Sequence, residues 1–286
     1  MESMQNRVNG LLEKTLTEGK KSSRIMRAAR YSVLAGGKKL RPCLVYAASF
    51  ATNGSLTAAD SSAIAVELVH AYSLIHDDLP AMDDDKLRRG QPTTHIAFGE
   101  SYAILAGDAL QALAFDILAG SRLNMSMRLK QIQLLSQAIS FNGMAFGQEL
   151  DLLAENKKQE LPELEFMHAC KTGSLIKASV LMGAVVGKNE SSEIKNSLCK
   201  YAENVGLAFQ IHDDILDITG TTKQLGKNIK RDENLGKLTF PALIGLNASK
   251  KRAKELIDEA LEVLHSIPGN QVPLKGLAKR IIERTN

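Results

Sequence analysis

Tryptophan is absent from the 286 residues of this chain, and aromatic residues make up only 5% of it. Strands prefer β-branched and aromatic side chains, whereas helices favour residues such as Ala, Leu and Met, which are abundant here. Alternating apolar and polar residues over the length of a strand are also missing from the sequence. The composition therefore predicts an all-α protein and argues against a β-sandwich.

Cysteine and proline are scarce. The three cysteines, Cys43, Cys170 and Cys199, show no C-x-x-C spacing, which argues against a disulfide scaffold and against a thiolate zinc site. There are 7 prolines, and no Pro-, Ser- or Gly-rich linker divides the chain. We therefore expect a single domain over residues 1–286, although the length alone would also allow two.

The sequence also lacks a large excess of charge of one sign. The 36 Lys and Arg residues against 32 Asp and Glu give a net charge of +4, and the two signs interleave, so no nucleic-acid partner is indicated. Residues 1–17 are polar and mixed in charge, unlike a signal peptide. Uninterrupted apolar runs are shorter than the roughly eighteen residues of a membrane span. These features predict a soluble, cytoplasmic protein with no membrane span.

Apolar residues recur with helical spacing in several segments. The clearest are residues 61–79, 122–147 and 201–218. Two further segments, residues 103–118 and 174–186, are apolar on more than one face. Such helices lie in the middle of a large bundle or at a subunit interface. We therefore expect a thick helical bundle that could form a dimer.

Two acidic clusters follow strongly apolar helical segments. The first comprises Asp77, Asp78 and Asp83, and the second comprises Asp213, Asp214 and Asp217. A solvated helix end is the ordinary interpretation of a single such pair. Carboxylates are, however, unfavourable at a helix C-terminus and repel each other. A hard cation such as Mg²⁺ would neutralise them and would leave coordination positions for phosphate oxygens. Two facing clusters are therefore expected to hold a diphosphate through Mg²⁺.

Fixed positive charge suited to a diphosphate occurs in several short motifs. They are Gly36-Gly37-Lys38-Lys39-Leu40-Arg41, Arg88-Arg89-Gly90, Lys171-Thr172-Gly173, Lys227 and Gly236-Lys237. Each taken singly could be a surface cation. The first is not a P-loop, because the spacing of its glycines and lysine differs and no strand precedes it.

Together these motifs resemble those of the trans-prenyl diphosphate synthases, and the similarity is closest to the bacterial farnesyl diphosphate synthases. The similar region runs from about residue 28 to residue 241, with a further C-terminal match that ends at Arg284. The resemblance implies a homodimeric all-α fold of the isoprenoid synthase type, with a deep central cavity in each subunit. It also implies a Mg²⁺-dependent transfer of an allylic group to isopentenyl diphosphate, with three Mg²⁺ ions in the site. The main product would be farnesyl diphosphate.

The resemblance also assigns roles to individual residues. The main metal ligands would be Asp77, Asp83 and Asp213, supported by Asp78, Asp214 and Asp217. The allylic diphosphate would be bound by Arg88, Lys171 and Lys227, and Lys237 would close over the loaded site. Isopentenyl diphosphate would be bound by Lys38, Arg41, His70 and Arg89. Thr172 and Gln210 would direct oxygen dipoles toward the developing allylic cation, and Tyr72 would limit the length of the product.

Other functions remain possible from the sequence. A geranyl or geranylgeranyl diphosphate synthase of the same family would carry the same motifs. A terpene cyclase would lack the second acidic motif and the basic residues Lys38 and Arg41. A non-catalytic helical subunit would be expected to have lost one acidic motif. The positions of His76 and His212, each just before an Asp-Asp pair, favour structural or supporting roles.

Overall fold

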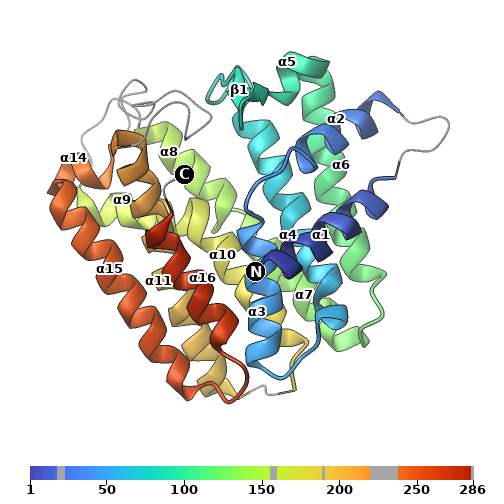
Figure 1. The fold of residues 1–286 in the computed structure, drawn as a ribbon. Helices are drawn as coiled ribbons and strands as arrows, with labels where there is room; N and C mark the ends of the chain where they lie inside the picture. The colour runs from blue at the N-terminus through green and yellow to red at the C-terminus, as the bar shows by residue number, and fades with distance from the viewer. Residues whose placement is uncertain (18–22, 155–159, 189–190, 220–237, 285–286) are drawn as a thin grey trace.

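Helices dominate the computed structural model, which describes residues 1–17, 23–154, 160–188, 191–219 and 238–284 (Figure 1). The all-α prediction is confirmed. An antiparallel hairpin of two strands, each two residues long, is the sole sheet among the described residues. The first half of the chain contains α1 (Glu2–Thr15), α2 (Arg24–Val33), α3 (Leu40–Ala51), α4 (Leu56–Asp77), β1 (Leu87–Arg88), β2 (Gln91–Pro92), α5 (Thr94–Phe98), α6 (Glu100–Ala119) and α7 (Met125–Ile139).

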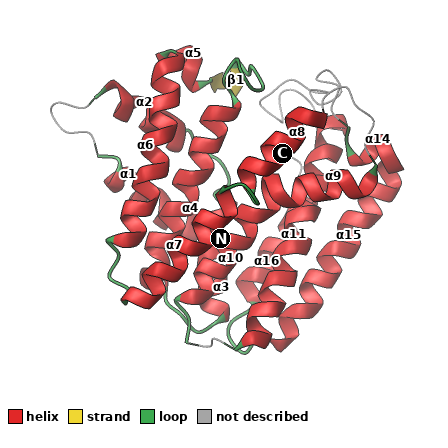
Figure 2. Cartoon of the chain, turned by 180° about the vertical axis from the view of Figure 1, so that it is seen from behind, coloured by secondary structure: helices red, strands yellow, loops and turns green. Residues whose placement is uncertain are grey.

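The second half of the chain continues the bundle with α-helices and two short helical segments of other types. It contains α8 (Met144–Ala154), α9 (Leu161–His168), the π-helical η1 (Ala169–Gly173), α10 (Ser174–Val185), α11 (Ser192–Thr219), α14 (Phe240–Ile244), α15 (Leu246–Val263), the 3₁₀-helical η2 (Leu264–Ser266) and α16 (Val272–Glu283). Seen from behind in Figure 2, the long helices run side by side, with the hairpin and α5 at one end of the bundle.

The central helix of the first half is α4, which packs against α3, α6 and α10. It begins at a good N-cap, because the Ser55 side chain accepts a hydrogen bond from the backbone of Ala58. It ends at Asp77, three residues before Pro80, as expected from the restriction that proline places on a helix. The first acidic motif therefore starts at the last residue of a buried helix.

One predicted helical segment is divided in the structure. The pattern over residues 122–147 covers the whole of one helix, α7, and the start of another, α8. The chain turns tightly at Gly143, where a Cβ atom would lie 2.2 Å from the carbonyl oxygen of Ala138. Because apolar periodicity continues across such a turn, the sequence pattern alone did not reveal the break.

The two helices predicted to be apolar on more than one face differ in their burial. Helix α10 is buried over most of its surface, whereas α6 exposes the side chains of Ile104 and Leu105 by 45% and 46%. Helix α6 is long and apolar enough to pass a test for a membrane span by composition, and 33% of the tested stretch is buried in the protein. When only one helix passes this test, it is weak evidence for a membrane span.

Candidate active site

A cavity of about 400 Å³ lies between the C-terminal end of α4, α8, η1, α11 and the start of α3. Its volume is within the range of small-molecule sites. Most of the residues predicted to form the site line it, although they come from segments more than a hundred residues apart. They are Arg41, His70, Tyr72, Asp77, Arg88, Arg89, Lys171, Thr172, Gln210 and Asp213.

The first acidic motif continues from α4 into a tight turn. The backbone nitrogen of Asp83 donates a hydrogen bond of 2.9 Å to the carbonyl oxygen of Asp77, which folds the turn back over the helix end. Burial raises the pKa of Asp77 to about 6, with Lys171 opposing and Asp83 adding to the rise. A carboxylate in this environment is one that an added cation would stabilise.

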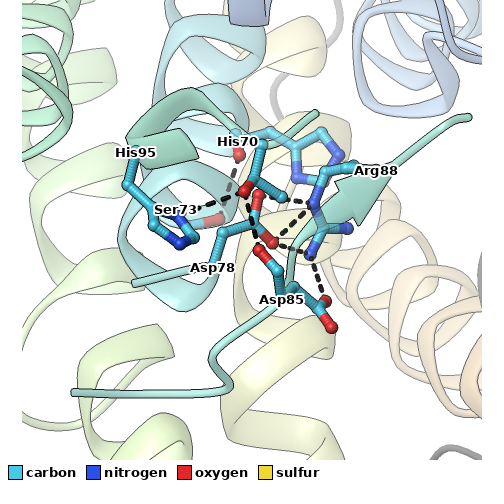
Figure 3. A network of polar contacts seen from close by, with 7 residues as sticks. His70, Ser73, Asp78, Asp85, Arg88 and His95 are labelled. Carbon is cyan, nitrogen blue, oxygen red and sulfur yellow. Dashed lines mark hydrogen bonds and ion pairs between the residues drawn. The ribbon is translucent and has the colours of Figure 1, made fainter. Parts of the chain in front are cut away.

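Asp78 faces away from the open cavity and binds Arg88. Figure 3 shows the Arg88 side chain between Asp78 and Asp85. The Nε of Arg88 lies 2.9 Å from both carboxylate oxygens of Asp78, which is 2% exposed, and Asp85 lies 3.6 Å from the same guanidinium. The hydroxyl of Thr93 holds the backbone of this turn by donating to the carbonyl oxygen of Asp85. Asp78 therefore orients an arginine that lines the cavity.

The second acidic motif lies on α11, and its aspartates occupy different environments. The side chain of Asp213 is 40% exposed and pairs with Arg284 at 2.7 Å. Asp214 is 2% exposed and accepts hydrogen bonds from the Gln210 side chain and from the backbone nitrogen of Phe240. Asp217 is likewise buried, at 3%. Asp213 thus faces the cavity, while Asp214 fixes neighbouring parts of the fold.

Two further predicted residues belong to a π-helical turn. Lys171 and Thr172 lie in η1, a type of bulge that is frequent at functional sites. A Cβ atom at Gly147 of α8 would lie 2.1 Å from the backbone nitrogen of Lys171, so glycine is needed for this close approach. The Lys171 ammonium pairs with Asp151 at 2.6 Å. The hydroxyl of Thr172 donates to Gln210 Oε1 at 3.1 Å.

Basic residues gather at the start of α3. The Nε of Arg41 is buried and has no hydrogen-bond partner among the described residues. Arg89 donates to the carbonyl oxygen of Gly36 at 2.7 Å. Its guanidinium lies so close to Gly37, where φ is +99°, that a side chain there would be excluded. Burial holds the pKa of His70 well below 6.5, and Arg41 and Arg89 add to this effect, so the imidazole is neutral.

Some residues of the site were not found from the sequence. Gln148 of α8 lines the cavity, and both polar atoms of its amide are buried without a partner in the described part of the chain. Asp151 fixes Lys171, as described above. Both lie within the sequence Gly147-Gln148-Glu149-Leu150-Asp151, whose Gly and Asp fall on the buried face of α8. Two predicted residues, Lys227 and Lys237, lie outside the described residues.

The groups around the cavity fit magnesium. The candidate ligands are carboxylate oxygens, which select hard cations. Asp77 and Asp213 line the same cavity from different helices, and burial raises the pKa of Asp77, a cost to its charged form that a bound cation would offset. Among the described residues, no three acidic, histidine or cysteine side chains converge into a complete metal site. In proteins, Mg²⁺ usually takes one or two carboxylates and fills its other positions with water and phosphate oxygens.

The chain is similar to proteins of known function over nearly its whole length. Residues 22–267 match the family model described as polyprenyl synthetase. The chain is 48% identical to the farnesyl diphosphate synthase of Escherichia coli, covering 91% of this chain and 89% of that protein. It is 44% identical to the farnesyl diphosphate synthase of Haemophilus influenzae, covering 99% and 97%. A geranylgeranyl diphosphate synthase of Cyanophora paradoxa is 42% identical, covering 98% and 93%.

A solved structure is similar over the same length. It is a geranyltransferase from Helicobacter pylori complexed with magnesium and isoprenyl diphosphate. The TM-score is 0.85 and the sequences are 32% identical, covering 98% of this chain and 96% of that one.

Proposed function

The chain belongs to the polyprenyl synthetase family, and we propose that it is a farnesyl diphosphate synthase. The proposed reaction is the magnesium-dependent condensation of isopentenyl diphosphate with dimethylallyl or geranyl diphosphate. The observation that carries this proposal is the arrangement of one cavity. Carboxylates of α4 and α11 line it together with Arg41, His70 and Arg89, and the Nε of Arg41 is buried without a hydrogen-bond partner among the described residues. Such a site suits two diphosphates, one bound through metal and one bound without it.

The acidic motifs are the proposed metal ligands. Asp77, Asp83 and Asp213 would bind Mg²⁺, and three ions are proposed. Bound magnesium supplies positive charge that stabilises the departing diphosphate. The other three aspartates are proposed as supporting residues: Asp78, Asp214 and Asp217. Their burial and, for Asp78 and Asp214, their hydrogen bonds to Arg88 and Gln210 support this role.

The proposed allylic site uses fixed cations beside these carboxylates. Arg88 is held by Asp78, and Lys171 is held by Asp151, so both charges are fixed before substrate binds. Fixed positive charges stabilise a leaving group without reorganising during the reaction. Lys227 is proposed as a further ligand of this diphosphate. Lys237 is proposed to close over the site once substrate is bound.

The isopentenyl diphosphate would bind to Lys38, Arg41, His70 and Arg89. The Nε of Arg41, buried without a hydrogen-bond partner among the described residues, supports this assignment, because a buried donor without a partner is costly unless a ligand provides one. His70 is neutral, so it would contribute a hydrogen bond without adding charge. The basic pocket thus provides the second diphosphate site.

The chain would also guide the allylic cation after the C–O bond breaks. Thr172 and Gln210 line the same cavity as Asp77, and the Thr172 hydroxyl donates a hydrogen bond to Gln210 Oε1. Such dipoles favour nearby positive charge. The apolar side chains of the lining, Leu74, Met144 and Phe209 among them, would help to exclude water, which would trap the cation as an alcohol. The departing diphosphate then accepts the proton released when the new bond forms.

The proposed enzyme is a cytoplasmic homodimer of single-domain subunits. One connected core of buried apolar residues extends from α1 to α16, which supports a single domain. The exposed apolar side chains of α6 and α7 support a subunit interface. They include Ile104, Leu105 and Leu129, which is 66% exposed. Large apolar patches on a protein surface usually mark an interaction site.

Longer products are the second candidate, because geranylgeranyl diphosphate synthases are among the relatives of this chain. Tyr72 favours the fifteen-carbon product, since its side chain lines the cavity beside Asp77. The proposed function is tested by incubating the purified protein with both substrate classes and measuring diphosphate release and product length. Turnover should require Mg²⁺ and both substrates. Release of diphosphate from an allylic substrate alone would indicate a terpene cyclase instead, and no turnover at all would contradict the proposal.

A further inference from the structure

A buried ion pair joins three helices behind the basic pocket. The ammonium of Lys39 lies 2.9 Å from the Glu67 carboxylate, and the two side chains are only 2% and 4% exposed. The same ammonium donates a 2.9 Å hydrogen bond to the carbonyl oxygen of Val33. Val33 is the last residue of α2, Lys39 is the N-cap of α3, and Glu67 lies within α4. One side chain therefore ties the end of α2 and the start of α3 to α4.

Stability alone does not explain this pair. Removing two charges from water costs much of the energy that their attraction returns, and a well-packed apolar pair is often as stable. Lys39 also has a φ of +49°, in the left-handed region that residues other than glycine rarely adopt. Such a conformation persists only where the surroundings hold it, and it is most frequent at functional sites. The location of the ion pair, beside the basic residues of the site, indicates its function.

Lys39 and Glu67 are close to the residues that are proposed to bind isopentenyl diphosphate. Lys39 lies between Lys38 and Arg41 in the chain, and Glu67 precedes His70 by three residues on the same face of α4. Glu67, His70 and Arg89 line one small pocket behind the cavity. Burial lowers the pKa of Arg41 and of Arg89, and the Glu67 carboxylate opposes that effect in both.

We infer that Lys39 and Glu67 are positioning residues for isopentenyl diphosphate. Their ion pair holds the turn of residues 36–39, so that the side chains before and after Lys39 reach the same diphosphate. The hydrogen bond from Arg89 to the carbonyl oxygen of Gly36 adds a third cation to this turn. This inference rests on the proposed function, because it concerns the site that Lys38, Arg41 and Arg89 would form.

The test replaces both charges together. Lys39→Met with Glu67→Leu leaves the net charge of the pocket unchanged and leaves neither member of the pair as a buried ion without the other. A loss of affinity then reports geometry and not electrostatic attraction. We expect the KM for isopentenyl diphosphate to rise at least tenfold, while kcat and the KM for the allylic substrate change less than twofold. Calorimetry with isopentenyl diphosphate alone, which cannot react without an allylic partner, should show the same loss of affinity.

Two comparison variants separate positioning from general stability. Arg7→Met with Asp60→Asn removes another ion pair, of 2.6 Å, that joins α1 to α4 outside the cavity lining. It should lower the melting temperature without changing either KM. Lys39→Arg keeps a cation within reach of Glu67 and Val33, and should keep the KM for isopentenyl diphosphate within threefold of wild type. Equal changes in both KM values and in kcat for the double variant would overturn the inference.

The outcome also distinguishes this inference from the proposed function. If Arg41→Ala raises the KM for isopentenyl diphosphate but the double variant does not, the site assignment stands and the positioning role is wrong. If the wild-type protein neither turns over nor binds isopentenyl diphosphate, the proposed function itself is wrong. Should the double variant not fold, Glu67→Gln provides the test. Because it removes a negative charge beside an anion site, electrostatics alone would lower the KM, so a raised KM supports positioning and a lowered one refutes it.

Discussion

The guanidinium of Arg284 lies 2.7 Å from the carboxylate of Asp213, so the end of the chain is in contact with the second acidic motif. Arg284 also donates to the carbonyl oxygen of Phe209 at 2.9 Å and lies 4.1 Å from the centroid of that ring. The imidazole Nε2 of His212 contacts the carbonyl oxygen of Arg284 at 2.9 Å. His212 therefore fastens the end of α16 to α11, which fits a structural role for this residue.

Arg284 should compete with magnesium for Asp213. We expect Arg284→Gln to lower the half-saturating Mg²⁺ concentration by about two- to fivefold, because partly exposed ion pairs contribute only about 0.2–1 kcal/mol. The measurement is a calorimetric titration of Mg²⁺ in the presence of inorganic diphosphate, together with the metal dependence of turnover. Arg280→Gln, also on α16, is the matched control and should leave the requirement unchanged. An unchanged or higher requirement in Arg284→Gln would show that the arginine does not oppose the metal.

Asp77 and Asp213 should both be required for turnover but not for folding. Replacing either by Ala should lower kcat by roughly a hundredfold or more, the size of loss expected when an electrostatic stabiliser is removed. Asp77→Ala should not lower the melting temperature, because burial raises the pKa of this carboxyl to about 6 and its charged form is costly in the folded state. The exposed Asp258 of α15 serves as control, since Asp258→Ala should affect neither property. Near-normal turnover at saturating Mg²⁺ would refute the assignment.

His70 should make the protein less stable as the pH falls. Burial, Arg41, Arg89, Arg88 and Lys39 together hold its pKa well below 6.5 in the folded state, whereas the unfolded chain binds a proton near pH 6.5. Below that value the unfolded state holds more protons, so the free energy of unfolding decreases with decreasing pH by up to about 1.4 kcal/mol per pH unit from this residue. Urea unfolding between pH 7 and pH 5 should show a shallower decrease for His70→Gln than for wild type. Parallel curves would mean that the pKa of His70 is not lowered in the folded protein.

The helical class could be predicted from local signals, whereas most residues of the cavity were predicted from the family that the motifs resemble. Helical periodicity marks α4 and α11, and the acidic motifs follow their apolar faces. Residue spacing alone could not predict which carboxylates face the cavity, because the motifs are dense and neighbouring aspartates point in different directions. The family resemblance named Asp77 and Asp213 among the main metal ligands. Asp77 and Asp213 line the cavity, whereas Asp78 and Asp214 are buried against Arg88 and the backbone of Phe240.

The contacts missed by sequence reasoning join distant parts of the chain. The ion pair of Lys39 and Glu67 spans 28 residues, and the hydrogen bond from Arg284 to Phe209 spans 75. Neither residue type nor spacing specifies such a partner, since a lysine or arginine has many carboxylates within reach in a helical bundle. His76 shows the same limit. It precedes an acidic pair in the sequence, yet its ring bonds to the carbonyl oxygen of Ile104 and packs against Gly107 of α6.

Tyr72 should limit the length of the product. Its side chain lines the cavity together with Asp77, and its ring packs edge to face against His76, with the centroids 5.8 Å apart. On an ideal helix Tyr72 lies five residues and roughly 7–8 Å below Asp77, a depth at which a growing allylic tail would meet the phenol ring. Tyr72→Ala should therefore extend the main product from fifteen carbons to twenty or more, as measured by chromatography of the dephosphorylated alcohols.

The matched variant Tyr72→Phe keeps the ring and should keep the fifteen-carbon product. Truncation to Ala also leaves a cavity that can lower the free energy of unfolding by a few kcal/mol, so thermal melting must accompany the product analysis. A folded Tyr72→Ala enzyme that still makes fifteen-carbon product would leave Tyr72 as an ordinary packing residue. The length limit would then have to come from other side chains of the cavity, of which Ser73 is nearest in sequence and Met144 approaches from α8.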